Sequence, residues 1–178
     1  MESIRRYIII TILILLLGMS MGGMYYFSSQ EGSVSSAQSN IAIEIIDKIR
    51  DRVTLQNEKL IIVKDKVVNK LRGYGKSFVV RKAAHFSIYA TIGGLMMIII
   101  YLLSKQIIFS GCISFTLAFL YAVFDEKRQL GIDGRSGSLK DVFIDSSGAL
   151  FAISILAFIF MIFKIINFIF GKKRRHFN

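Results

Sequence analysis

The amino-acid sequence predicts an all-α, polytopic membrane protein with four transmembrane helices and an amphipathic helical outer loop. Hydrophobic residues make up 53% of the 178 residues, and the mean hydropathy is +0.55. They gather in long runs rather than in the periodic stripes of soluble helices. Four runs approach or exceed the roughly 20 residues that a helix needs to cross a bilayer. We expect one membrane domain over residues 1–178.

The predicted spans cover residues 7–27, 83–103, 106–124 and 142–170. The first follows Arg5 and Arg6, as a signal peptide would, but its apolar run is long and offers only a poor cleavage site. We therefore expect it to remain as a helix. In the fourth, Asp145 and Lys164 are separated by roughly 28 Å of helix. They can reach opposite interfaces if Lys164 extends its stem outward.

The distribution of basic residues predicts the orientation. Arg5 and Arg6, Lys105, and the cluster 172–175 fall on one side of the four spans. Short basic flanks face the cytoplasm, so we expect both termini inside the cell and residues 28–82 and 125–141 on the outer side of the membrane. The net charge of +11 then orients helices and meets anionic lipid head groups. No nucleic-acid partner is expected, because the 172–175 cluster is short and adjoins a span.

The long outer loop divides into two parts. Residues 28–40 are rich in serine and are expected to be irregular. Apolar residues three and four apart then predict two amphipathic helices, over residues 41–53 and 60–71, with Gly73 and Gly75 ending the second. These helices would lie on the membrane surface or cap the bundle, or form a plain hairpin. The one cysteine, Cys112, lies in an apolar run and predicts no disulfide.

Polar residues gather at the predicted outer edge of the membrane. They are Lys82, His85, Tyr89, Asp125, Glu126, Gln129, Arg135, Asp141 and Asp145. The helix macrodipole explains Asp141 at the start of the fourth span, but it disfavours Asp125 and Glu126 at the end of the third. Acids close to lipid usually have a partner or a task. Arg135, in a glycine-rich loop, is able to hold a carboxylate or a phosphate with two hydrogen bonds.

This set of residues supports three chemistries. The acids with His85 suit a divalent cation, and His85 with a carboxylate suits general acid–base catalysis. Lys82, Arg128 and Arg135 suit an anionic lipid head group, a role that we favour for Arg135. A salt-bridge network that merely ties the helices together is the alternative. The sequence contains neither a metalloprotease HExxH motif nor a phosphate-binding loop.

Three sequence blocks, in this order, carry a resemblance to the VanZ-like family: FSSQEGSVSSAQS, FVVRKAAHFSIYATIGGL and YAVFDEKRQLGIDGRSGSLKDVFIDSSGAL. The resemblance places the family's polar signature on the polar residues named above, among which His85, Asp125 and Glu126 are the candidate catalytic residues. It implies ligand-binding roles for Ser28, Ser29, Gln30, Lys82, Tyr89, Gln129, Arg135, Asp141 and Asp145. The chain departs from the family pattern at Ile88, Arg128, Asp133 and Ala152, where many relatives have Glu, His, Pro and Gly.

The founding member of that family is associated with resistance to the glycopeptide teicoplanin. The resemblance therefore implies a bacterial cell-envelope protein with a link to glycopeptide resistance. We expect an outward polar site that binds or processes an anionic lipid-linked or lipid-like molecule. Its partners would be membrane lipids, lipid-linked envelope precursors or a lipoglycopeptide. A non-catalytic protein that shields precursors or scaffolds envelope enzymes is the alternative. Transport is weaker, because the second and third spans carry no charge at mid-depth.

Overall fold

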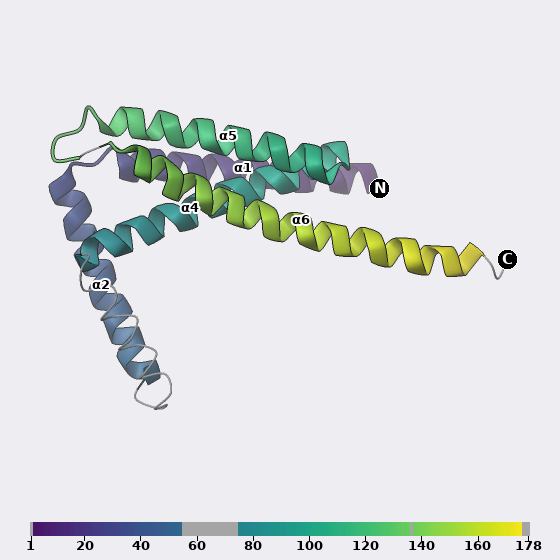
Figure 1. Ribbon diagram of the computed structural model, residues 1–178, viewed down its shortest axis with the longest axis horizontal. Coiled ribbons are helices and arrows are strands. Elements are labelled where there is room, and N and C mark those ends of the chain that lie inside the picture. Colours follow the sequence, from purple (N-terminus) through teal and green to yellow (C-terminus); the bar gives the residue numbers. More distant parts are fainter. Residues whose placement is uncertain (1, 55–74, 136, 176–178) are drawn as a thin grey trace.

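The computed structural model describes residues 2–54, 75–135 and 137–175. This part of the chain forms five helices and no strand: α1 (Glu2–Ser28), α2 (Gly32–Thr54), α4 (Lys76–Ser104), α5 (Ile107–Gln129) and α6 (Leu139–Arg175). All but α2 are long and apolar enough to cross a membrane. The predicted all-α fold with four spans is confirmed (Figure 1).

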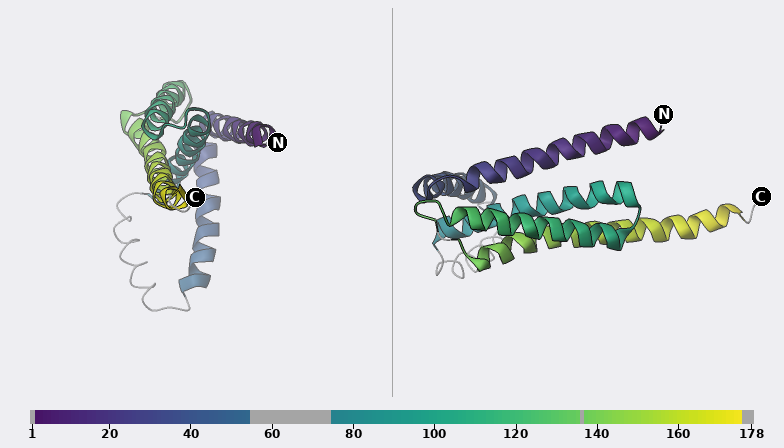
Figure 2. Two further views of the ribbon diagram at one scale, coloured as in Figure 1. Left: turned by 90° about the vertical axis from the view of Figure 1, so that its right-hand side faces the viewer. Right: turned by 90° about the horizontal axis from the view of Figure 1, so that it is seen from above.

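The four long helices lie side by side, and α2 leaves the bundle at a steep angle (Figures 1 and 2). Both termini and the turn between α4 and α5 lie at one end, which we call the terminal end. The α1–α2 and α5–α6 connections lie at the other, the loop end. Arg6 donates a hydrogen bond to the carbonyl of Leu102, and Lys105 closes α4 with a left-handed backbone (φ 59°). The basic clusters that predicted the orientation therefore share one end.

Small residues bring α4 and α6 into close contact near the loop end. A Cβ atom added to Gly148 would lie 2.2 Å from the carbonyl oxygen of Phe86, and one added to Gly93 would lie 2.8 Å from Ala149. Lipid tails are as apolar as the helix side chains, so the hydrophobic effect does not drive helices together in a membrane. Helices there associate instead through close packing at small residues. The contact lies within one turn of His85 on α4 and Asp145 on α6, so it sets the distance between them.

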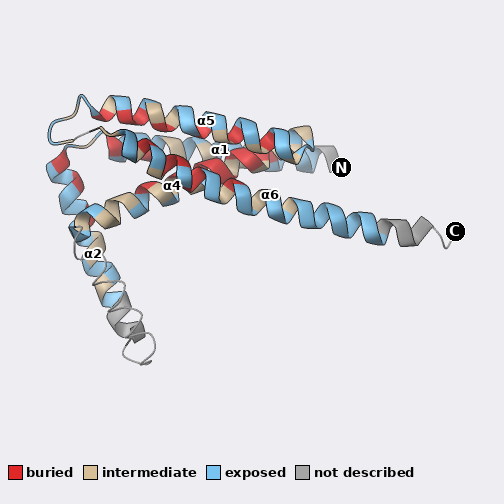
Figure 3. Cartoon of the chain, viewed as in Figure 1, coloured by how far each residue is buried: buried red, intermediate tan, exposed pale blue. Residues whose placement is uncertain are grey.

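Apolar side chains cover most of the outer surface of the bundle. Large residues such as Ile108, Phe151 and Phe158 are well exposed, and residues 161–170 of α6 are all exposed within the described part of the chain (Figure 3). Such a surface is unfavourable in water and suitable for contact with lipid. Buried residues gather instead where α1, α4, α5 and α6 meet, around Tyr89, Ile92 and Met24. The chain is therefore a multi-pass membrane protein in contact with membrane lipids.

All four long helices are longer than their predicted spans. α4 begins at Lys76 rather than at residue 83, so Arg81 and Lys82 lie within it. α5 continues past residue 124 to Gln129, which keeps Asp125 and Glu126 in helical backbone. α6 extends from Leu139 to Arg175. Apolar runs define only the part of a helix that meets lipid, and these polar turns continue the same hydrogen-bonded backbone beyond it.

The prediction that residues 28–40 are irregular is wrong, because α2 begins at Gly32. Ser36 and Ser39 donate hydrogen bonds to carbonyls one turn earlier, at 2.8 and 2.9 Å, so their hydroxyls are satisfied inside the helix. Ser35 and Ser39 are also buried, on a helix that packs against α4. The first predicted amphipathic helix, residues 41–53, is part of α2. The second, residues 60–71, lies outside the described residues.

Candidate functional site

A buried carboxylate on α5 lies at the centre of the loop end. Asp125 is 1% exposed and accepts three hydrogen bonds. Ser28 at the end of α1 donates at 2.8 Å, Gln129 at 2.9 Å and Arg128 at 2.8 Å. A buried charge is tolerated when it is paired and hydrogen-bonded. The first and third sequence blocks therefore meet at this acid.

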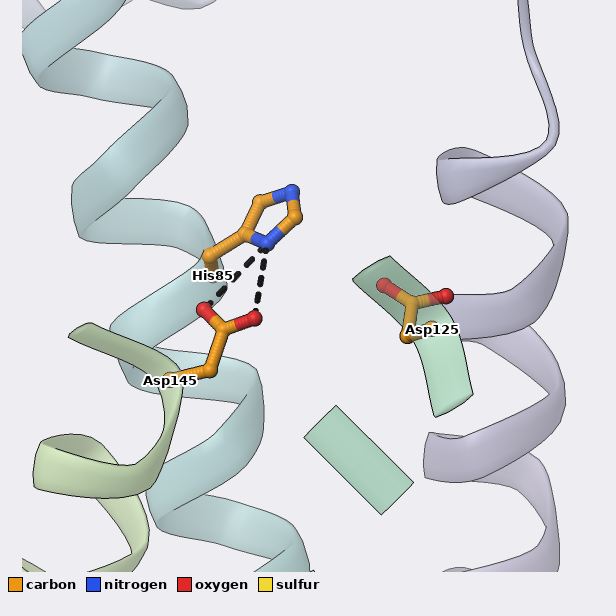
Figure 4. A group of neighbouring side chains, drawn as sticks. All are labelled: His85, Asp125 and Asp145. Carbon is orange, nitrogen blue, oxygen red and sulfur yellow. Dashed lines mark hydrogen bonds and ion pairs between the residues drawn. The ribbon is translucent and has the colours of Figure 1, made fainter. Parts of the chain in front are cut away.

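A second buried acid faces His85 between α4 and α6. The Nδ1 atom of His85 lies 3.3 Å and 3.4 Å from the two carboxylate oxygens of Asp145 (Figure 4). Both side chains are largely shielded from solvent, at 11% and 1% exposure. Asp125 approaches this pair from α5, and one ligand-type atom from each of the three residues lies within 4.8 Å of the others. Three helices thus contribute one compact group.

Tyr89 lies one turn after His85 on the same face of α4. It is fully buried, and its ring packs against that of Tyr121 on α5, with 5.8 Å between centroids. Its hydroxyl is close enough to Asp125 and Asp145 to interact with them electrostatically. Among the described residues, nothing forms a hydrogen bond with that hydroxyl. A buried hydroxyl without a partner costs free energy, and such positions need an explanation.

Two further predicted acids are engaged by the protein itself. Lys82 forms an ion pair with Asp141 at 2.5 Å, which joins α4 to the first turn of α6. One oxygen of Glu126 accepts the backbone N–H of Ser138 at 3.1 Å, just before α6 begins. Its other oxygen is buried and has no hydrogen-bond partner in the described part of the chain. These contacts attach α6 to α4 and α5, and this structural role explains much of the polar sequence at the loop end.

Arg135 is held by three neutral acceptors. It donates to the carbonyl of Gln30 at 2.9 Å, the carbonyl of Phe27 at 2.9 Å and the side-chain oxygen of Gln129 at 3.1 Å. No described carboxylate lies within ion-pair distance of it. Burial, together with the nearby charge of Arg81, lowers the pKa of the Arg135 guanidinium, although arginine stays protonated in proteins. Its positive charge is therefore not neutralised by a direct partner.

Arg128 has a different environment. Its guanidinium lies 3.9 Å from the centroid of the Tyr25 ring and bonds to Asp125, the Tyr25 carbonyl and the hydroxyl of Ser29. These contacts use most of its donors, so Arg128 ties α5 to α1 and is poorly placed for a ligand. Ser29 in turn donates to the Tyr25 carbonyl at 2.6 Å. Gln30 contributes a backbone carbonyl to Arg135, and its own side-chain oxygen is buried without a described partner.

Two neighbouring cavities lie at the loop end. A polar cavity of about 80 Å³ is bordered by Phe78, Arg81, Lys82, His85, Gln129, Gly134, Arg135 and Asp141. A crevice of about 210 Å³ lies beside it between α1, α2 and α4. Arg81, His85 and Arg135 border both. Sequence reasoning missed Arg81 as a site residue, although its position one turn before His85 was a usable signal.

The larger groove between α5 and α6, about 770 Å³, has a different character. It lies nearer the terminal end and is mostly apolar, with Lys164 its only charged residue. None of the predicted site residues borders it. At this depth an apolar groove between helices is an ordinary lipid-facing surface. The predicted site residues lie instead at the loop end.

The predicted site residues all lie at this loop end, but they do not line one cavity. Lys82, His85, Gln129, Arg135 and Asp141 border the polar cavity. Asp125, Asp145 and Tyr89 are packed behind His85, while Ser28, Ser29 and Gln30 hold the arginines and Asp125 from α1 and the turn after it. The residues thus separate into a bordering group and a supporting group, which sequence spacing alone does not distinguish.

Comparison with known proteins gives one match. The family model described as VanZ/LLP1 matches residues 11–164, which include all five described helices except parts of α1 and α6. The match contains every residue of the site described above. Neither the curated proteins nor the solved structures contain a match to this chain.

Proposed function

Because the chain belongs to the VanZ/LLP1 family, we propose that it is a cell-envelope membrane protein that binds the head group of an anionic lipid-linked or lipid-like molecule at its loop end. The observation that carries the proposal is the pair Arg81 and Arg135. Both border the two neighbouring cavities, and neither has a carboxylate partner among the described residues. With both termini in the cytoplasm, this end faces outward.

The charge balance favours an anion as ligand. Arg81 and Arg135 are close enough for their charges to repel each other, and burial increases that cost. A phosphate or carboxylate between them offsets the repulsion and matches the donor geometry of a guanidinium. The polar cavity of about 80 Å³ holds the equivalent of two or three water molecules, at about 30 Å³ each, which is enough for a small anionic group.

The neighbouring crevice favours an attached apolar chain. Its wall includes Met24, Phe27, Val80 and Ile88, and it meets the polar cavity at His85 and the two arginines. An amphipathic molecule would place its anionic group at the arginines and the start of its chain along this wall. Ile88 occupies the position where many relatives have Glu, so the wall is more apolar here than the family pattern implies.

His85 is placed to act on a bound head group. It borders both cavities, and Asp145 behind it holds the imidazole by its Nδ1 side. A histidine oriented by a carboxylate is a common arrangement for proton transfer. We propose this role for His85 should the ligand be processed. A protein that only shields or scaffolds envelope components would need the arginines but not His85.

Lipid binding tests the proposal directly. The purified protein in neutral detergent is mixed with phosphatidylglycerol, a polyprenyl phosphate or phosphatidylcholine, and retained lipid is counted by native mass spectrometry. We expect the two anionic lipids to be retained at least tenfold more strongly than the neutral lipid, and Arg81→Gln to remove that preference. Lys164→Gln, an exposed basic position nearer the terminal end, is the matched control. Equal retention of all three lipids, or an unchanged preference in Arg81→Gln, would refute head-group binding.

A cellular assay separates the two functional classes. The chain is expressed in a bacterium sensitive to teicoplanin, and susceptibility and envelope stress are measured. His85→Gln at normal abundance should lose the effect if the histidine acts on a ligand. Retention of the full effect in His85→Gln, with loss in Arg81→Gln, would favour the shielding or scaffolding function. The readout is compared at equal amounts of folded membrane protein.

A further inference from the structure

The group formed by His85, Asp125 and Asp145 has a second property, independent of the arginines. We propose that these three side chains bind a divalent transition-metal ion, with Zn²⁺ and Mn²⁺ as the best matches. One ligand-type atom from each residue lies within 4.8 Å of the other two, and the residues come from α4, α5 and α6 (Figure 4). The proposal goes beyond head-group binding, because it gives the chain an inorganic cofactor behind the cavity.

The His85–Asp145 distances fit two ligands of one ion better than an ion pair. Charge-assisted hydrogen bonds between nitrogen and carboxylate oxygen are about 2.7–2.9 Å long. The Nδ1 atom of His85 is instead 3.3 Å and 3.4 Å from the two oxygens of Asp145. Metal–ligand bonds of about 2.0–2.2 Å with roughly tetrahedral angles place neighbouring ligand atoms about 3.3–3.6 Å apart. The pair is therefore already spaced as an edge of a coordination polyhedron.

The negative charge of the group favours binding of a cation. Asp145 is 1% exposed, and His85 is its one ion-pair partner among the described residues. Asp125 is neutralised by Arg128, so the cluster carries one uncompensated negative charge when His85 is neutral. Leaving a carboxylate buried and unpaired is strongly unfavourable. A bound cation offsets this negative charge, and neutral imidazole is the form in which histidine coordinates metals.

Asp125 already has the outer contacts typical of a metal-binding carboxylate. Ser28 and Gln129 donate to Oδ2, and Arg128 donates to Oδ1. Hydrogen bonds of this kind orient ligands around a metal. Oδ1 accepts one described hydrogen bond and so keeps a lone pair for an ion. The three ligand atoms lie within 4.8 Å of one another, and neighbouring ligands of one ion lie about 3.3–3.6 Å apart. Side-chain movements of about 1–1.5 Å would bring them to that spacing.

Tyr89 provides the second, independent indication. Its side chain is fully buried next to both carboxylates, and its hydroxyl has no hydrogen-bond partner in the described structure. One oxygen of Asp145 likewise accepts no hydrogen bond. A water molecule bound to the ion would satisfy these atoms, since buried waters take such positions. The polar cavity that His85 borders gives the ion a route from the loop end.

The ligand types select the class of metal. One imidazole and two carboxylates suit Zn²⁺, Mn²⁺ or Fe²⁺, whereas Ca²⁺ and Mg²⁺ favour sites made entirely of oxygen ligands. Fe²⁺ adds redox chemistry that nothing in the group requires. We therefore use Zn²⁺ and Mn²⁺ as the probes.

The test measures metal content in the purified full-length protein. The protein is stripped with a chelator, incubated with Zn²⁺ or Mn²⁺, passed through a desalting column and analysed by mass spectrometry of the metal. We expect about one ion per chain and at least a hundredfold weaker binding in Asp145→Asn. This variant keeps nearly the same side-chain volume. Asp133→Asn, an exposed carboxylate in the loop at the same end, is the matched control and should bind as the parent does.

Two measurements keep the result interpretable if a variant folds poorly. Pulsed paramagnetic resonance of bound Mn²⁺ should show a coordinated nitrogen that disappears in His85→Gln. Arg81→Gln should bind metal normally, so a failure here and a failure of lipid binding are separate outcomes. Equal metal content in the parent and Asp145→Asn, or bound Mn²⁺ without a nitrogen signal, would overturn the site. A protonated His85 paired with Asp145 would then account for the geometry.

Discussion

Ser28, the last residue of α1, donates a 2.8 Å hydrogen bond to the buried carboxylate of Asp125 on α5. The two residues are 97 positions apart in the chain. α1 packs mainly on α4 and makes few contacts with α5, so this bond is one of a small number that join α1 to α5. The FSSQ block thus supplies one donor and one acceptor to the site: Ser28 donates to Asp125, and Ser29 accepts from Arg128.

Ser28→Ala should destabilise the protein by about 1–3 kcal/mol, because it removes a donor from a buried carboxylate. Thermal unfolding in detergent, followed by circular dichroism or by loss of monodisperse protein, measures the effect. Ser20→Ala on the same helix is the control. Its hydroxyl is exposed and bonds only to the carbonyl one turn earlier, so its removal should be nearly neutral. Equal melting temperatures for the two variants would show that the Ser28 bond adds nothing.

Gly148→Ala should separate α4 from α6. The added methyl carbon would lie 2.2 Å from the backbone oxygen of Phe86, and a backbone atom cannot move aside as a flexible side chain can. We expect a loss of about 1–3 kcal/mol or more, together with weaker metal and lipid binding, because His85 and Asp145 sit beside the contact. Gly22→Ala, which has nothing within 4 Å, should unfold like the parent. A stable Gly148→Ala variant with an intact site would argue against this packing.

The sequence predicts the spans well because apolar runs follow bilayer thickness directly. It predicts the loop end less well. Residues 32–40 read as an irregular loop, since serine is a weak helix former, yet Ser36 and Ser39 bond within the helix and Ser35 is buried. Tertiary packing, invisible in a local pattern, overrides propensity here. Helix ends were misplaced for a different reason, because apolar runs mark only the part of a helix that meets lipid.

The sequence likewise predicts one part of the site well and another part poorly. Spacing alone placed His85 with Tyr89 and Asp141 with Asp145, and these residues do share the loop end. Spacing could not show that Arg135 would be held by three neutral acceptors rather than by acids. Nor could it show that Arg128, the departure from the family's histidine, would be engaged by Tyr25 and Asp125. Such assignments depend on which loop folds over which helix.

Arg135→Lys tests whether that arginine is structural, ligand-binding or both. Lysine keeps the charge but not the fork that reaches the carbonyls of Phe27 and Gln30 and the side chain of Gln129. We expect a stability loss of at least about 1.5–3 kcal/mol, the contribution of one hydrogen bond to a charged group. Arg81→Gln should lose lipid binding with little change in stability. Unchanged melting of Arg135→Lys would mean that its three contacts are dispensable and that its role lies with the ligand.

The orientation is testable by cysteine labelling. In a Cys112→Ala background, we expect Glu44→Cys on α2 to react with a membrane-impermeant maleimide added to intact cells, and His176→Cys to react only after permeabilisation. Glu44 is exposed, and its ion pair with Lys48 is solvent-accessible, so the substitution should be nearly neutral. Labelling of position 176 but not 44 in intact cells would reverse the topology and place the candidate site at the cytoplasmic face.

The last prediction concerns the crevice between α1, α2 and α4. Ala84 borders it on α4, whereas the adjacent Ala83, which is also exposed, does not. Ala84→Phe should fill part of the roughly 210 Å³ space and exclude an apolar chain, while Arg81 and Arg135 remain in place. We expect retention of polyprenyl phosphate to fall at least tenfold, with binding of inorganic phosphate and of Zn²⁺ unchanged, because neither ligand carries a chain. Ala83→Phe, which adds the same ring to the lipid-facing side, should bind all three ligands as the parent does. If Ala84→Phe and Ala83→Phe retain polyprenyl phosphate equally, the chain of the ligand does not enter this crevice, and head-group contacts alone would have to explain any preference for anionic lipids.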